Sequence, residues 1–275
     1  MKSLTSSSLG ALAALSACMF APAPAGAAGT LFLNRCEAGC AYTGGPNDSC
    51  ANTSAVFTGS RFLAATTYDD ADWNSLVACV ESVLDPFDVT LTTTEPVCGG
   101  GYWEIPVAGT SANLGLPDGL PSVSPFSCAP ISNAPAFVFA SAMADPLLAC
   151  WRVLNVFGSL MGADYVHDGR DPMTVNDGCL APRFSAVPLP CTGIWVPGNC
   201  CTGAATQTSQ AILFGVLGKR PGGAVFGDGF EAWSSTSQVL SGSTCHWDQA
   251  LAGLALAGTE ADAVPGLALA SPSEH

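Results

Sequence analysis

The cysteines that follow residue 27 constrain the fold of this chain more than any other feature. The chain has 275 residues and thirteen cysteines, of which only Cys18 precedes that point. The remaining even set is typical of an exported protein and allows up to six disulfides. Metal binding is the weaker interpretation, because no C-x-x-C pair occurs and the most similar spacing, Cys36-x-x-x-Cys40, has no matching pair downstream. We therefore expect a disulfide-bonded domain.

The first 27 residues have the features of a signal peptide. Lys2 supplies a positive charge, Leu9–Phe20 is apolar but too short to span a bilayer, and Ala25-Gly26-Ala27 is a typical cleavage site. An alternative stays open, because Leu15-Ser16-Ala17-Cys18 is similar to a bacterial lipobox. We expect a bacterial product that is secreted, periplasmic or at the cell surface, with a lipid anchor on Cys18 as the alternative.

Composition limits the partners. Only 11% of the residues are charged and 48% are apolar, which excludes a disordered chain. Eight Lys and Arg against 22 Asp and Glu give a net charge of −14, so we expect no nucleic-acid partner and little attraction to an anionic membrane. The apolar run Leu251–Leu256 is too short for a transmembrane segment.

Periodicity predicts a mixed α+β domain. Ala71–Asp85 has one apolar face, Asp70 or Asp72 can cap its start, and Pro86 ends it. We expect Cys79 to reach the strand that follows, and Cys128 and Cys150 to tie another strand to the central helix. The expected strands are Thr30–Asn34, Phe87–Thr93, Tyr102–Ala108 and Pro135–Ala140, the further helices are Pro146–Leu160 and Thr206–Leu217, and Thr110–Pro125 is expected to be a loop.

The segment Arg35–Asn52 is rich in Cys, Gly, Asn and Asp, and its Gly44-Gly45-Pro46-Asn47-Asp48 run favours turns. Its acidic and amide oxygens suggest a calcium loop, but the D-x-[DN]-x-[DN]-G spacing and the closing glutamate are missing. A cross-linked surface loop is the favoured interpretation.

The stretch Cys150–Thr174 joins a long apolar helix, a break at Gly162 and Asp171-Pro172-Met173-Thr174. It resembles the metzincin zinc proteases, matrixin- or astacin-like, in an exported bacterial group. Their frame is H-E-x-x-H-x-x-G-x-x-H followed by a methionine turn (Met-turn). Aligned on Gly162, the three zinc ligands fall on Asn155, Ser159 and Tyr165, and the general base falls on Val156. Only Gly162 and the turn methionine, Met173, match the family.

The resemblance implies a metzincin-like fold over residues 28–218: a twisted sheet backed by a helix, a central helix, the Met-turn and a C-terminal helix. Residues 219–275 are expected to be a partly disordered extension. Because amide, hydroxyl and valine side chains replace the ligands and the base, we predict a pseudoprotease without catalytic residues, metal or cofactor. His167 lies near the third ligand position and could turn inward, but one imidazole does not hold zinc.

Three functions remain open. A cleft rimmed by Thr110–Pro125 would bind a peptide or protein without cutting it. The family default is an active zinc-dependent endopeptidase, which would need zinc ligands elsewhere. The third is a structural or adhesive exported protein with an unrelated fold and no enzyme activity.

Overall fold

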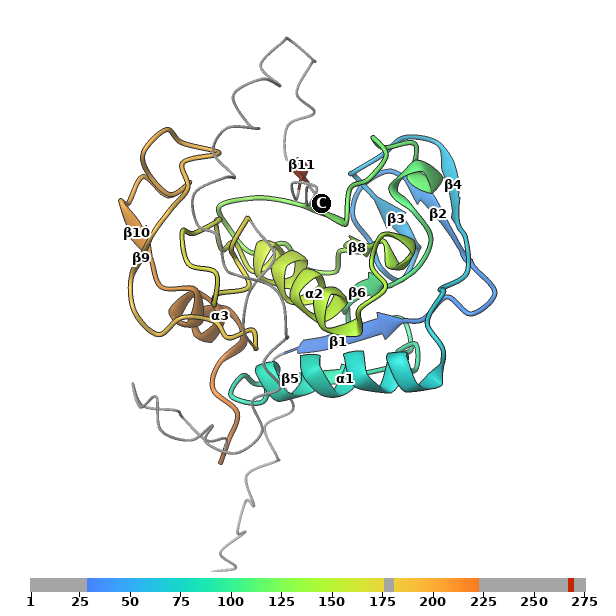
Figure 1. The fold of residues 1–275 in the computed structure, drawn as a ribbon, viewed down its shortest axis with the longest axis horizontal. Helices are drawn as coiled ribbons and strands as arrows, with labels where there is room; N and C mark the ends of the chain where they lie inside the picture. Colours follow the sequence, from blue (N-terminus) through green and yellow to red (C-terminus); the bar gives the residue numbers. More distant parts are fainter. Residues whose placement is uncertain (1–28, 176–180, 223–266, 270–275) are drawn as a thin grey trace, which may run out of the picture.

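The computed structural model describes residues 29–175, 181–222 and the strand Leu267–Leu269. The predicted signal peptide, Cys18 and nearly all of the C-terminal extension lie outside these residues. The described part is a mixed α+β structure (Figure 1). It contains three α-helices, small sheets and four disulfides. None of its helices has the length and apolar character needed to cross a bilayer.

Parallel strands form the first sheet. Strand β1 (Gly29–Asn34) lies between β5 (Val89–Thr92) and β6 (Trp103–Pro106) and runs parallel to both. Parallel bridges then link β6 to the segment of β8 (Phe137–Val138), and β7 (Ser122–Pro125) pairs antiparallel with β8. In the order β5-β1-β6-β8-β7, strand β7 is therefore antiparallel to its neighbour β8. The expectation that Thr110–Pro125 is only loop was wrong, since it holds β7 and the 3-10 helix η1 (Ser111–Leu114).

Two helices of equal length lie side by side in the middle and lower part of the molecule (Figure 1). Helix α1 (Asp70–Leu84) begins at the cap Asp69, whose carboxylate accepts a hydrogen bond from the Asp72 amide, so the prediction of Asp70 or Asp72 as the cap was wrong. Helix α2 (Pro146–Leu160) has the predicted bounds. The disulfide Cys79–Cys150 joins the two helices. Cys79 therefore pairs with a helix rather than with the following strand, and the expected link through Cys128 and Cys150 was also wrong.

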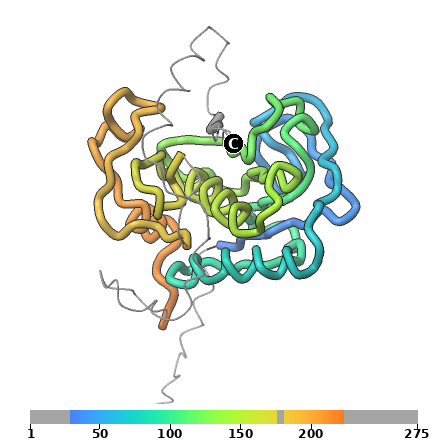
Figure 2. The backbone as a smooth tube through the Cα atoms, viewed as in Figure 1, coloured from blue at the N-terminus to red at the C-terminus, as the bar shows by residue number. Residues whose placement is uncertain are grey.

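A second small sheet lies away from α3. It contains β2 (Cys40–Gly44), β3 (Thr53–Ser54) and β4 (Ser60–Leu63), with β2 in the centre. Figure 2 shows this blue region on the right, the yellow to orange segment up to residue 222 on the left, and α2 between them. The left-hand segment contains β9 (Leu189–Pro190), β10 (Thr206–Gln207) and α3 (Ser209–Leu217), which ends at Gly218 as predicted.

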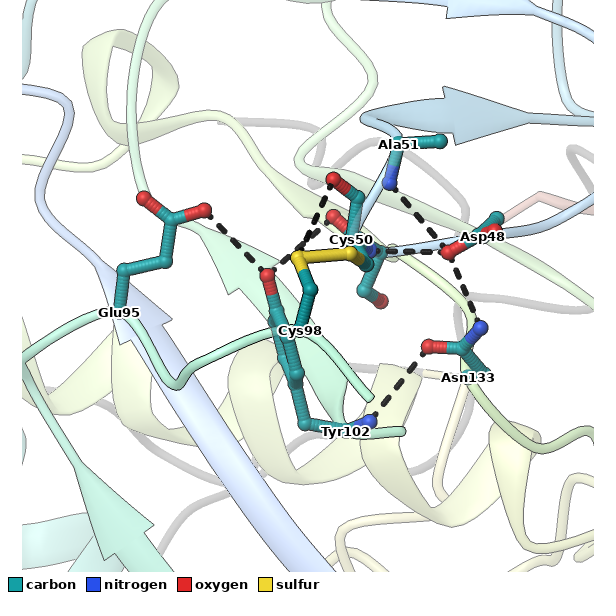
Figure 3. The surroundings of a disulfide bond; sticks show 8 residues. Asp48, Cys50, Ala51, Glu95, Cys98, Tyr102 and Asn133 are labelled. Carbon is teal, nitrogen blue, oxygen red and sulfur yellow. Dashed lines mark hydrogen bonds between the residues drawn. A yellow bond between two sulfur atoms is a disulfide. The ribbon is translucent and has the colours of Figure 1, made fainter. Parts of the chain in front are cut away.

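The segment Arg35–Asn52 is cross-linked, as the favoured interpretation predicted, but it is not only a loop, since it contains β2. Cys50 is bonded to Cys98, and Asp48 Oδ1 accepts hydrogen bonds from the amides of Cys50 and Ala51 and from Asn133 Nδ2 (Figure 3). The Asp48 oxygen is therefore occupied by donors of the protein itself. The disulfide and these bonds fix the loop against the segment that leads into β8.

A buried carboxyl group links the two sheets. Glu104 on β6 accepts hydrogen bonds at Oε1 from Asn34 Nδ2 at 2.7 Å and from the Tyr42 hydroxyl at 2.8 Å. Burial raises the pKa of Glu104 to about 7, although these two hydrogen bonds lower it in part. Asn34 Oδ1 also accepts the Cys36 amide, which holds the start of the Cys36–Cys40 disulfide loop. The carboxylate of Glu104 thus connects β6 to both β1 and β2.

Candidate functional site

The positions singled out by the resemblance lie at the end of α2 and in the chain that follows it. Asn155, Val156 and Ser159 are on α2, and Tyr165 follows the break at Gly162. All four side chains are at most 2% exposed, and Met173 is fully buried. Water and substrate therefore do not reach these side chains in this conformation.

Asn155 connects α2 directly to the turn that contains Met173. Its Nδ2 donates to the Pro172 carbonyl at 2.7 Å and lies 3.5 Å from the Thr174 carbonyl. Its Oδ1 has no hydrogen-bond partner among the described residues. Because the amide group donates to the backbone on both sides of Met173, Asn155 fixes the position of the turn against the helix.

Ser159 and Tyr165 also bond to backbone. Ser159 Oγ donates to the Asn155 carbonyl one helical turn earlier, at 3.1 Å. The Tyr165 carbonyl accepts the Thr192 amide at 2.9 Å, and burial raises the pKa of the Tyr165 phenol to about 12. These hydrogen bonds thus hold the backbone together, and none of them joins two of the three side chains Asn155, Ser159 and Tyr165.

Met173 packs against a glycine of α2. A Cβ atom added to Gly158 would lie 2.3 Å from Met173 Sδ and 3.1 Å from Phe184 Cε1. Only a residue without a side chain allows this approach. The sequence analysis did not single out Gly158, although a lone glycine inside an apolar helix often marks close packing.

Gly162 meets two separate requirements. Its φ of +86° lies in the left-handed region, which ends the helix, and a Cβ would lie 3.1 Å from the Ala129 carbonyl carbon. The Leu160 carbonyl, two residues earlier, accepts the Ile131 amide at 2.8 Å. The segment after β7 therefore lies directly against the end of α2.

Two aspartates that flank Tyr165 and Met173 are buried. Asp171 accepts hydrogen bonds from the amides of Met173 at 2.8 Å and Ser185 at 2.9 Å, and burial raises its pKa to about 6 despite these bonds. Asp164 accepts from the amides of Tyr165 and Cys201, both at 2.7 Å. Each of these two carboxylates therefore joins two segments of the chain.

The residues at the expected ligand positions do not fit zinc. A carboxamide, an aliphatic hydroxyl and a phenol with a raised pKa are weak ligands compared with imidazole, and Val156 has no group that accepts a proton. His167 is exposed rather than turned inward. Within residues 29–175 and 181–222, no three His, Cys, Asp or Glu side chains form a group that could hold a metal ion.

The outer edge of β7 carries a different kind of site. Strand β11 (Leu267–Leu269) pairs antiparallel with β7, with Leu267 opposite Pro125 and Leu269 opposite Val123. It comes from the C-terminal extension, more than a hundred residues after β7 in the sequence. The edge of β7 therefore accepts an extended segment through backbone pairing.

Comparison of the chain with protein-family models, with curated proteins and with solved structures finds no match.

Proposed function

We propose that this chain is an exported pseudoprotease with a metzincin-like frame that binds an extended peptide along the edge of β7 without cutting it. The observation that carries the proposal is the antiparallel pairing of β11 with β7. Strand addition to an exposed sheet edge is a common mode of peptide recognition, in which backbone hydrogen bonds provide affinity. Strand β7 also lies within the segment that the resemblance places at the rim of a protease cleft.

The arrangement around α2 supports the metzincin-like part of the proposal. A sheet with a helix packed beside it, a central helix followed by a left-handed glycine, a methionine packed against that central helix and a later helix follow one another as the resemblance implies. The lack of catalysis follows from side-chain chemistry, because Asn155, Ser159 and Tyr165 stabilise the fold where a protease of this kind would bind zinc.

Export is supported by the disulfides. Four pairs among the described residues are typical of a protein that folds in an oxidising compartment. The predicted signal peptide would direct export. Its removal after Ala27 is checked by the N-terminal sequence of the mature protein.

The binding test uses the full mature chain and a labelled peptide, Gly-Leu-Ala-Leu-Ala-Ser, which copies residues 266–271. In one variant, Ala268→Pro, the tail strand loses a backbone donor and pairs less well with β7. The control variant, Ala255→Pro, places proline elsewhere in the extension. Fluorescence polarisation should show saturable binding, at least about fivefold tighter to A268P than to the wild type or A255P, because the tethered tail no longer competes.

The outcomes separate the three functions. Saturable binding with an intact peptide by mass spectrometry is the result we expect. Cleavage that a chelator abolishes would show an active zinc endopeptidase. Absence of saturable binding to A268P would favour a structural or adhesive protein.

A further inference from the structure

Two thiols meet where the segment after β7 lies against the loops that follow the Met-turn. Eight cysteines of the described residues form disulfides, and Cys128 and Cys201 are free. The two thiols are neighbours, since Cys128 contributes to the raised pKa of the Cys201 thiol. Cys201 directly follows Cys200, which is bonded to Cys191.

Contacts on both sides of the pair hold the two segments together. Phe126 stacks on Trp195 with ring centroids 4.5 Å apart and an interplanar angle of 14°. The residue after Cys128, Ala129, lies against Gly162, and the amide of Cys201 donates to Asp164 Oδ2 at 2.7 Å. Both cysteines are therefore fixed over the same turn, Gly162–Asp164, by interactions that do not involve their sulfur atoms.

We propose that Cys128 and Cys201 form a further disulfide in the exported protein, in addition to the four among the described residues, and that it fastens the end of β7 to the loop that contains Trp195. The bond would join segments that are 73 residues apart in the sequence and hold the β7 edge at a fixed distance from the end of α2. The inference does not depend on peptide binding, since it follows from the position of the two thiols.

The chemistry is thiol–disulfide exchange with a small disulfide as the oxidant. Cys128 is exposed, so its thiolate attacks a sulfur of the oxidant, forms a mixed disulfide and releases the first reduced thiol. Cys201 then attacks the Cys128 sulfur of the mixed disulfide and releases the second. The two cysteines lose two protons and two electrons, and the oxidant takes up both. Burial and the contact with Cys128 raise the pKa of Cys201 to about 12, which favours Cys128 as the first nucleophile.

The test counts free thiols in the full mature chain after equilibration with oxidised and reduced glutathione and unfolding in denaturant. The variants are Cys128→Ser, Cys201→Ser and the double variant C128S/C201S. Cysteines elsewhere contribute the same number to every count. With the disulfide present, the wild type and the double variant have equal counts, and each single variant has one thiol more.

Other counts overturn the proposal. Two more thiols in the wild type than in the double variant mean that both thiols stay reduced. Pairing of Cys128 with Cys200 and of Cys191 with Cys201 would give the same counts, so fragmentation of the linked peptide must show which of Cys200 and Cys201 is bonded to Cys128, and a bond to Cys200 would contradict the proposal. Mass spectrometry of the alkylated, unreduced wild type provides a second measurement that does not depend on variant folding: we expect Cys128 in a peptide linked to Cys201, and an alkylated Cys128 would contradict it.

Discussion

Helices α1 and α2 have the same length and begin at the same kind of cap, but they are buried to very different extents. Each has 15 residues and starts after an aspartate, Asp69 or Asp145, whose carboxylate accepts a backbone amide. Helix α1 buries four residues along one face, whereas α2 buries twelve. In α2, polar side chains such as Asn155 and Ser159 must find partners inside the protein. The residues aligned with the protease motif, such as Asn155 and Ser159, therefore lie on the helix whose polar side chains stabilise the fold.

The disulfide between these helices should give the largest effect. Replacing Cys79 and Cys150 with alanine opens a link between residues 71 apart, and the loss of chain-entropy stabilisation is about 4 kcal/mol. The Cys36–Cys40 bond spans only four residues and should contribute about 2 kcal/mol. Chemical denaturation of both double variants under non-reducing conditions measures the difference. Equal losses would mean that α1 is not held to α2 by this bond.

The buried carboxyl beside Met173 should make stability depend on pH. Because the pKa of Asp171 is raised to about 6 in the folded chain, folding favours the protonated form. Its stabilising contribution is full below the ordinary pKa of 3.8 and is lost as pH rises through about 6. The free energy of unfolding should fall by on the order of 3 kcal/mol over this range.

The variant Asp171→Asn should remove this part of the pH slope between pH 4 and 7, as measured by urea denaturation. Asp69→Asn at the exposed cap of α1 is the control and should retain the slope. An unchanged slope in D171N would show that Asp171 is not the group responsible.

Alanine substitution of two helical glycines distinguishes the cost of overpacking from the gain in helix propensity. Gly158→Ala forces a Cβ against Met173 Sδ, and overpacking of this kind costs about 1–3 kcal/mol. Gly215 in α3 has no atom within 4 Å of a Cβ position, so Gly215→Ala should instead stabilise the protein by up to about 1 kcal/mol. Thermal unfolding of both variants checks the signs. A stabilised G158A would contradict the close packing of α2 on Met173.

Substitution of the caps should have the smallest effect and should be similar in both helices. Asp69→Ala and Asp145→Ala each remove one acceptor of a backbone amide, which costs about 1 kcal/mol. Denaturation curves of the two variants should therefore shift by similar amounts. A much larger loss in D145A would mean that the difference in burial extends to the start of α2.

The sequence predicted the elements that have a strong periodic pattern. Helix α2 has its predicted bounds, and α1 begins one residue earlier than expected. The strand β7 was missed because it has only four residues, Ser-Val-Ser-Pro, and two of them are polar. In the folded chain both serines are buried, which the sequence does not indicate.

Long-range pairing was not accessible from the sequence. The partner of Cys79 depends on how α1 and α2 pack, and an even number of cysteines leaves the connectivity open. For the site, the side-chain types at Asn155, Ser159 and Tyr165 were sufficient to predict poor metal ligands. Their partners depend on the turn at Pro172–Thr174 and on the loop at Thr192, so the sequence alone did not predict them.

The most direct test of the central claim measures zinc and proteolysis in one sample of the purified mature chain. The protein is incubated with zinc and an unfolded protein substrate, passed through a desalting column, and assayed for bound metal and for new peptide termini. If Asn155, Ser159 and Tyr165 serve the fold, the chain retains no stoichiometric zinc and the substrate stays intact. One tightly bound zinc ion per chain, together with cleavage that a chelator abolishes, would contradict the account.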